Sequence, residues 1–548
     1  MLDNPSARTR TATQAPGALA PAPQVRGLPD QQAVQALAQL RAAAADVLDW
    51  RRVDVDSLQA LRTLDAAALR VLESMLAEFA ALGAHVQAQD RRLVRPALEL
   101  CAAFVQAFEH VVKLAREARG QLVRAPDVLV RLLRYRDIEM ALTLCQYDSL
   151  QRARWRTLHD TYRLACELNL ANTPVVVGQR AGGADVTVSA HEVYVRILLL
   201  EVAGAGQLLP SDIAATRRSL ARWVEGLALQ PADATSLADG PRGFWLNLDG
   251  MGGLTRNAPV PATGALWLDT TPLAGAIDAE VESLRESADP AAPRRHLLLS
   301  RIAPIYAPAP PVVKRRGERS ENALAPAEVV TGGLEGLYRM LRDEARMRLD
   351  ASTAAPPDPG VDEIVISAAG LPGEGSARGD DAGGESANGA APAWQIRDAS
   401  DSGCRLRGRA ADLRMLLPGS LIAFREAKDA PWRLAVVRRL RKILGTNVEL
   451  GVERLAVGPQ RIVLTDPAAP RDPERGKRPR TIALYLPESA ECPRIPIKTL
   501  VVPAHEFAPG RVMTMASTSR DIAIRMREPL ESQADFVWTS FEFVDDAR

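Results

Sequence analysis

The residues of this chain whose types and spacing most clearly indicate a chemical role are Asp398, Ser400 and Gly403, which form the pattern D-x-S-x-x-G. An aspartate and a serine two positions apart on an extended segment project to the same side, so both can contact one polar edge of a ligand. A glycine lets the backbone turn or approach another group closely. The pattern indicates ligand binding rather than catalysis, and the flanking Trp394 and Leu406 indicate that it lies in β-structure.

A basic run, Lys314-Arg315-Arg316-Gly317-Glu318-Arg319, precedes this pattern. The guanidinium group of arginine is planar and presents a fork of donors that matches phosphate and carboxylate oxygens, and it also stacks on flat ring systems. Taken alone, such a run is more often a solvated linker or a weak nucleic-acid patch. Its place before the D-x-S-x-x-G pattern makes Arg315, Arg316 and Arg319 candidates for binding the same ligand.

Length and composition limit the function classes. A chain of 548 residues predicts three or four domains, and a net charge of +1 gives no overall attraction to nucleic acid or acidic membranes. No run of apolar residues is long enough to predict a signal peptide or a membrane-spanning helix, so we expect a bacterial, cytoplasmic protein that does not insert into a membrane. The cysteines form no C-x-x-C pair, which argues against a structural zinc; they are Cys101, Cys145, Cys166, Cys404 and Cys492.

The N-terminal half has a helical pattern. Residues 1–28 are rich in Pro, Ala, Thr and Ser and predict a disordered tail. Residues 29–230 carry apolar side chains at three- and four-residue spacing, which predicts a helical domain. Residues 231–300 predict a small mixed α/β segment with two short strands and a helix, and the Pro-rich stretch 303–311 predicts a linker or an extended arm.

The C-terminal half has a β pattern. Successive strand-like runs separated by turn residues predict an antiparallel β-barrel or β-sandwich within 311–455. It contains a flexible insertion at 351–393, where Ala, Gly, Pro, Asp, Ser and Glu dominate. Further strand-like runs predict a C-terminal β-unit over 456–548. The fold class is therefore α+β: a helical N-terminal module, an antiparallel β-barrel and a C-terminal β-unit.

The region 311–455 resembles a PilZ domain, the small β-barrel receptor for cyclic di-GMP. The resemblance rests on Arg315-x-x-x-Arg319, on the D-x-S-x-x-G pattern, and on the later strands around Trp432–Arg438 and Leu450–Glu453. It implies that the arginines, on a mobile segment before the barrel, clamp the guanines and phosphates, and that the D-x-S-x-x-G side chains bind a guanine. The implied ligand residues are Arg315, Arg319, Asp398, Ser400 and Gly403, with Arg316 as a supplementary contact; cyclic di-GMP is the ligand and no cofactor is implied.

Guanine chemistry agrees with these roles. Its O6 and N7 acceptors suit an arginine fork, and its N1 and N2 donors suit a carboxylate. The chain departs from the family in the gap of about 80 residues between Arg319 and Asp398, much of which is the 351–393 insertion. A second R-x-x-x-R, Arg342 and Arg346, lies in this gap, but on a helix it forms an ordinary solvated stripe, so the pair Arg315 and Arg319 is favoured.

Catalytic patterns are weak. His191-Glu192 begins like the zinc motif H-E-x-x-H, but residue 195 is a valine, so we interpret the pair as a helix-surface feature. We therefore expect a receptor, not an enzyme, that relays the cyclic di-GMP level to unknown protein partners in motility, attachment or biofilm formation. One alternative is a PilZ-like adaptor that binds no nucleotide. Another is a nucleic-acid-binding protein using its Arg-rich segments, which is disfavoured because few aromatic residues accompany those arginines.

Overall fold

The computed structural model divides the chain into two compact units, residues 1–312 and 313–548. Each unit is described by itself. The ranges that the structure describes are 30–82, 90–117, 126–179, 185–204, 206–231, 242–257, 264–289, 291–309, 325–351, 394–400, 402–409, 416–443, 447–471, 478–488, 497–516 and 521–544. The predicted tail 1–28 and the arginines 315, 316 and 319 lie outside these ranges, as does the predicted insertion 351–393 beyond its first residue.

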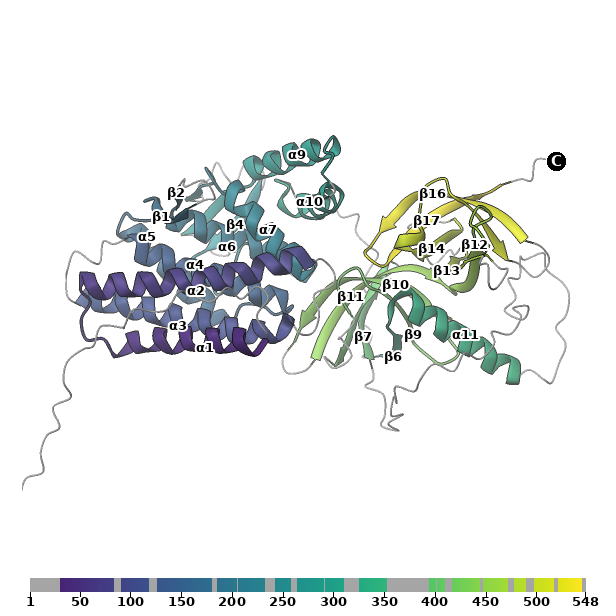
Figure 1. Ribbon diagram of the computed structural model, residues 1–548, viewed down its shortest axis with the longest axis horizontal. Coiled ribbons are helices and arrows are strands. Elements are labelled where there is room, and N and C mark those ends of the chain that lie inside the picture. Colours follow the sequence, from purple (N-terminus) through teal and green to yellow (C-terminus); the bar gives the residue numbers. More distant parts are fainter. Residues whose placement is uncertain are drawn as a thin grey trace, which may run out of the picture. The chain divides into compact units, whose positions relative to one another are not determined.

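The first unit is mainly helical (Figure 1). Its long helices carry apolar residues on the three- and four-residue spacing that the sequence predicts, and these residues face one another. The bounds are α1 (Asp30–Ala45), α2 (Val55–Leu82), α3 (Asp90–Glu117), α4 (Pro126–Cys145), α5 (Arg152–Glu167), α6 (Ala190–Gly204), α7 (Pro210–Trp223), α9 (Thr271–Arg285) and α10 (Ala292–Tyr306), with a 3₁₀ turn at Asp46–Asp49.

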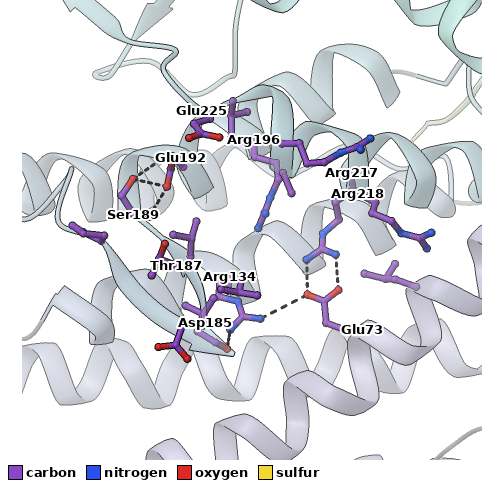
Figure 2. Close-up of a pocket in the computed structure, with 18 of the residues that line it drawn as sticks. Glu73, Arg134, Asp185, Thr187, Ser189, Glu192, Arg196, Arg217, Arg218 and Glu225 are labelled. Carbon is purple, nitrogen blue, oxygen red and sulfur yellow. Dashed lines mark hydrogen bonds and ion pairs between the residues drawn. The ribbon is translucent and has the colours of Figure 1, made fainter. Parts of the chain in front are cut away.

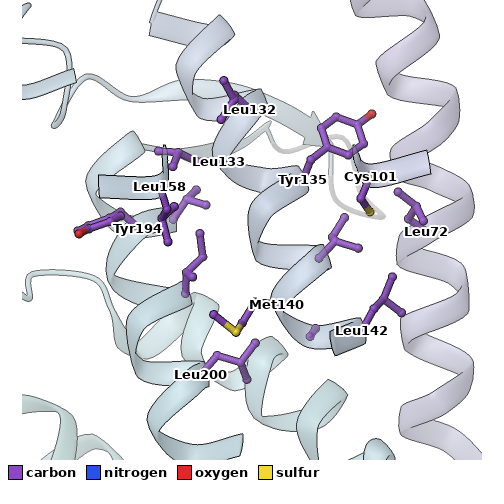
Figure 3. Close-up of a cluster of buried hydrophobic side chains, with 14 of the residues drawn as sticks. Leu72, Cys101, Leu132, Leu133, Tyr135, Met140, Leu142, Leu158, Tyr194 and Leu200 are labelled. Carbon is purple, nitrogen blue, oxygen red and sulfur yellow. The ribbon is translucent and has the colours of Figure 1, made fainter. Parts of the chain in front are cut away.

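Helix α4 lies at the centre of this unit. It packs against α3 and α6, and its side chains from Val128 to Cys145 are almost all buried. The rings of Phe104 and Tyr135 stack with their centroids 4.6 Å apart. Figure 3 shows part of this core, in which Tyr135 lies together with leucine, methionine and cysteine side chains from α2, α3, α4 and α6.

Short strands complete the first unit. The antiparallel hairpin of β1 (Val175–Gln179) and β2 (Asp185–Val188) lies in the chain before α6. A three-stranded antiparallel sheet has the order β3-β5-β4, and its strands are β3 (Leu229–Pro231), β4 (Gly243–Asn247) and β5 (Ala265–Asp269). Leu246, Leu268 and Leu273 join the same apolar core as the helices, so the 231–300 region is packed as part of this unit.

The prediction for the end of the first unit is wrong. The stretch 303–311 is not wholly an extended linker, because α10 continues to Tyr306 and contains Pro304. Ile302 and Tyr306 are fully buried, and the Tyr306 hydroxyl donates a hydrogen bond to the Leu199 carbonyl, 2.9 Å away. The burial of these two side chains and this hydrogen bond hold the last turn of α10 in place despite the proline.

The second unit begins with a closed six-stranded barrel. All its neighbouring strands are antiparallel, and they follow one another round the barrel as β6-β7-β8-β11-β10-β9. The helix α11 (Gly333–Ala351) follows β6 in the chain. The strand bounds are β6 (Ala325–Val330), β7 (Trp394–Ser400), β8 (Gly403–Arg409), β9 (Leu421–Arg425), β10 (Arg433–Lys442) and β11 (Asn447–Val457).

The remaining strands, in the region where a C-terminal β-unit was predicted, form a second closed barrel. Their order round the barrel is β12-β13-β14-β17-β16-β15. Numbered within each barrel, both orders read 1-2-3-6-5-4, so the two barrels have the same connectivity. The bounds are β12 (Gln460–Thr465), β13 (Arg480–Leu486), β14 (Thr499–Pro503), β15 (Val512–Ala516), β16 (Asp521–Ser532) and β17 (Phe536–Phe543), with a 3₁₀ turn at Ala504–Glu506.

The two barrels and α11 share one apolar core. Leu337 of α11, Leu434 of the first barrel and Trp538 of the second belong to the same buried cluster. Strand β13 is buried on both faces from Ala483 to Leu486, because one face lines its own barrel and the other joins this shared cluster. Arg438 also bridges the barrels, donating to Glu453 at 2.7 Å and to Glu531 at 2.6 Å.

Candidate functional site

The D-x-S-x-x-G residues lie on a tight hairpin of the first barrel. Asp398 and Ser400 belong to β7, Gly403 opens β8, and Ser400 pairs with Gly403. The register between the strands shifts between Ile396 and Asp398, which marks a β-bulge. Such a bulge re-aims the side chains beside it. The extended conformation predicted for this pattern is therefore confirmed.

The Asp398 carboxylate is buried and held by an arginine. It is 6% exposed and accepts hydrogen bonds from Nε of Arg405, 2.9 Å away, and from Nη2 of the same side chain. Arg405 lies directly across the hairpin from Asp398 and also donates to Glu449 at 3.2 Å. The hydrogen bond that Arg405 donates to Asp398 raises the pKa of Arg405 above its ordinary value. The carboxylate is thus oriented and has a fixed cationic neighbour.

The turn of the hairpin is anchored to β11. The Ser400 hydroxyl donates to the carbonyl of Gly403 across a distance of 3.2 Å. Nη2 of Arg454 donates to the Ser400 carbonyl at 2.6 Å, and the backbone N–H of Arg454 donates to the Ser402 carbonyl at 2.9 Å. These bonds fix the turn before any ligand arrives, which lowers the entropic cost of binding.

Gly403 is required by close packing rather than by an unusual backbone angle. A Cβ atom at this position would lie 2.1 Å from the carbonyl oxygen of Val452 in β11. No carbon atom can approach a backbone oxygen so closely, so only glycine allows β8 and β11 to pair at this register. The sequence reading assigned Gly403 a turn or a close approach, and the structure shows a close approach.

Sequence reasoning missed how some residues act in this hairpin. Arg405 lies outside the D-x-S-x-x-G pattern, yet it is the hydrogen-bond partner of Asp398. Arg454 has no motif of its own, and only the register of β11 against β8 brings it to the turn.

The interpretation of His191 as a surface residue is wrong: His191 is 9% exposed and its Nδ1 lies 2.8 Å from the Tyr162 hydroxyl.

The entry of the chain into this barrel lies beside the hairpin. Ala325, the first residue of β6, pairs with Ile396 of β7, and Ala327 pairs with Trp394. Because the strands are antiparallel, the chain enters β6 at the end of the barrel where β7 reaches Asp398 and Ser400. The helix α11 and the following 352–393 stretch connect the opposite end of β6 to the start of β7.

The described residues hold neither a metal site nor a membrane span. No group of three or more His, Cys, Asp or Glu side chains in the described ranges could hold a metal ion. None of the helices, in the parts that the structure describes, is long and apolar enough to cross a membrane. Cys404, beside the hairpin, is buried, and burial raises the pKa of its thiol to about 12.

A six-stranded barrel with a D-x-S-x-x-G hairpin, following a helical module, is the architecture of a multidomain cyclic di-GMP receptor that contains a PilZ domain. Comparison with protein families gives two matches: "Cyclic-di-GMP receptor FimW, N-terminal domain" over residues 22–233, and "Cyclic-di-GMP receptor FimW, middle PilZ domain" over residues 355–460. The chain belongs to the cyclic-di-GMP receptor FimW family. No curated protein matches it. The PilZ match covers Asp398, Ser400 and Gly403 and begins after Arg315 and Arg319.

Proposed function

We propose that the chain binds cyclic di-GMP at the β7–β8 hairpin, with Asp398, Ser400 and Gly403 on the barrel and Arg315, Arg316 and Arg319 on the segment that precedes β6. It acts as a receptor without catalytic activity. Ligand binding orders the arginine segment and so changes the surface offered to protein partners. Those partners act in motility, attachment or biofilm formation.

The pairing of β6 with β7 carries this proposal. Only five residues, 320–324, separate Arg319 from Ala325, the strand position opposite Ile396, which lies two residues before Asp398. An extended chain covers roughly 3.3 Å per residue, so the six steps from Arg319 tether it within about 20 Å of Ala325. The gap of about 80 residues along the sequence is therefore no obstacle, since the intervening residues leave β6 and return to β7 at the opposite end.

The chemistry of the hairpin suits a guanine edge. A carboxylate accepts hydrogen bonds from the guanine N1 and N2 groups, and arginine forks pair with O6, N7 and phosphate oxygens. Arg405 holds the Asp398 carboxylate in place, while its own partly exposed guanidinium adds positive charge beside the ligand. The arginine segment supplies further charge for the two phosphodiesters.

The adaptor alternative is favoured by one observation: Asp398 already has a partner in Arg405. A hairpin whose carboxylate is saturated by a fixed arginine would need no nucleotide to be stable. Binding of nucleotide therefore requires that Asp398 accept bonds from Arg405 and from guanine together. A carboxylate has two oxygens and several lone pairs, so both can be accommodated.

Calorimetric titration of the full chain with cyclic di-GMP tests this proposal, with GTP as a control ligand. The double variant Arg315→Ala/Arg319→Ala removes two charge-assisted contacts of about 1.5–3 kcal/mol each, so we expect the affinity to fall by about a hundredfold or more. Arg342→Ala/Arg346→Ala is the matched control, because it removes the other R-x-x-x-R pair, on the partly exposed face of α11.

Equal losses in the two double variants would refute the assignment of Arg315 and Arg319. A folded chain that gives no heat and no competition at high micromolar nucleotide would leave the adaptor function in its place. Steep, salt-dependent binding to RNA or DNA would instead support the nucleic-acid alternative.

A further inference from the structure

The first unit contains a cavity that the nucleotide site does not use. Its volume is about 890 Å³, within the usual range for ligand sites. Helices α2, α4, α6 and α7 and the whole of β2 contribute to its walls. Figure 2 shows the side chains that line it. None of these lining residues is aromatic, so the cavity offers no ring on which a nucleobase could stack.

Three arginines form what we call the arginine floor of this cavity: Arg134, Arg196 and Arg217. Arg217 makes a bidentate ion pair with Glu73, at 2.7 and 2.9 Å, and it shares the fully buried Asp137 with Arg196. Three guanidinium groups thus meet two carboxylates. Burial lowers the pKa of Arg134; the carboxylates of Glu73 and Asp65 oppose this shift, and the guanidiniums of Arg196 and Arg217 add to it.

The lining of the cavity carries five arginines and four acids, so its net charge is +1. At the rim the charges are balanced, because Arg218 and Arg222 are exposed and so are the acids Asp185 and Glu225. Of the other two lining acids, Glu73 is bound to Arg217, and Glu192 accepts hydrogen bonds from the backbone and hydroxyl of Ser189 at the start of α6. Arg196 is poorly satisfied: its Nε is buried and has no hydrogen-bond partner among the described residues. The arginine floor, rather than the rim, favours an anionic occupant.

The wall opposite the helices is a strand edge. In the described structure β2 pairs only with β1, in a two-stranded antiparallel hairpin. Half of the backbone groups of an edge strand point away from its partner and can pair with another chain. All residues from Asp185 to Ser189 line the cavity, so unpaired backbone groups and the arginine floor face the same space.

We propose that this cavity is a docking site for an extended, acidic segment of a partner protein, which adds a strand to β2 and places a carboxylate side chain over the arginine floor. Strand addition supplies backbone hydrogen bonds, and the acidic side chain supplies specificity. A small anion would use the arginines but would leave the edge of β2 unpaired. The proposal does not depend on nucleotide binding by the barrel.

The test begins with selection of binders from a random library of short displayed peptides on the full-length protein. Enriched sequences should carry Asp or Glu within alternating β-forming residues. Synthetic copies are then titrated by fluorescence anisotropy against two charge-reversed proteins, Arg218→Glu at the rim and Arg156→Glu on α5. Arg156 is exposed and does not line the cavity, so this variant controls for net charge.

We expect Arg218→Glu to weaken binding by about tenfold or more while Arg156→Glu leaves it unchanged, because only the first reverses a charge in the cavity. Replacing the acidic residue of the peptide by its amide, or inserting proline beside it, should weaken binding similarly. Three outcomes overturn the proposal: selected peptides without acidic residues, equal binding to both variants, or full competition by glutarate or inorganic phosphate, which would define a small-anion site. Circular dichroism melts of both variants check that each is folded.

Discussion

The close approach at Gly403 can be tested by adding a single methyl group. In Gly403→Ala the new Cβ would begin 2.1 Å from the Val452 carbonyl oxygen, and 3.2 Å from Cα of Glu453. The clash is with backbone atoms, so β11 itself must move by roughly 1 Å to restore van der Waals contact. No side-chain rotation can relieve it.

The cost has two sources. Inserting a methyl group into a packed region costs about 1–3 kcal/mol. Moving β11 also weakens the bonds from Arg454 to the Ser400 and Ser402 carbonyls, each of which contributes about 1 kcal/mol. We therefore expect the local free energy of opening of the β7–β8–β11 region to fall by about 3 kcal/mol.

Hydrogen–deuterium exchange of the full chain measures this loss directly. A drop of about 3 kcal/mol accelerates exchange of the β8 and β11 amides by about a hundredfold. Gly451→Ala is the matched control: this glycine also lies in β11, opposite Arg405, but its Cβ would meet only the Arg439 side chain, at 3.4 Å.

Wild-type protection of β8 and β11 in Gly403→Ala would refute the close-approach reasoning, as would an equal loss in Gly451→Ala. Cyclic di-GMP titration of the same proteins gives a second readout. The affinity should fall in Gly403→Ala and persist in Gly451→Ala, because only the first displaces the hairpin.

Two further predictions concern the first unit. Burial raises the pKa of Glu201 from 4.5 to about 7. The contribution of this carboxyl to the free energy of unfolding is therefore complete below pH about 4.5 and is lost as the pH rises through 7, by about 3 kcal/mol at pH 8. Urea titrations at several pH values should show this loss, and Glu201→Gln should abolish it. Arg217→Met should lower the free energy of unfolding, measured in urea, by about 3–5 kcal/mol, because it leaves the carboxylates of Asp137 and Glu73 short of a cationic partner. Arg163→Met, at a surface pair, should lower it by less than about 1 kcal/mol. Equal decreases in the two variants would contradict the role of burial.

Local patterns in the sequence predicted much of the fold. The helical domain predicted over 29–230 contains helices such as α7, because apolar spacing is set by contacts within one helix face. The strand-like runs predicted over 456–548 include β13 and β16. These elements carry their own periodicity, so no knowledge of distant residues was needed.

The features that sequence reasoning missed depend on contacts between distant residues. Strand β6, with its two alanines and a proline, has little strand propensity and is held by pairing with β7 and β9. The bond between Arg405 and Asp398 follows from the register of a hairpin, and the arginine floor joins residues from α4, α6 and α7. A single sequence carries no signal for such juxtapositions.

The two barrels of the second unit have the same connectivity and share a buried core, so they resemble two subunits of a dimer that are joined in one chain. In the first barrel, strands two and three are joined through Asp401 and Ser402, at the hairpin that carries the D-x-S-x-x-G pattern. In the second barrel, residues 487–498 make the same connection and contain no such pattern. The D-x-S-x-x-G pattern therefore belongs to the first barrel alone, although both barrels have the same strand order. Because the two barrels share this buried core, a distortion of the first barrel is transmitted to the second at any protein concentration, with no association step.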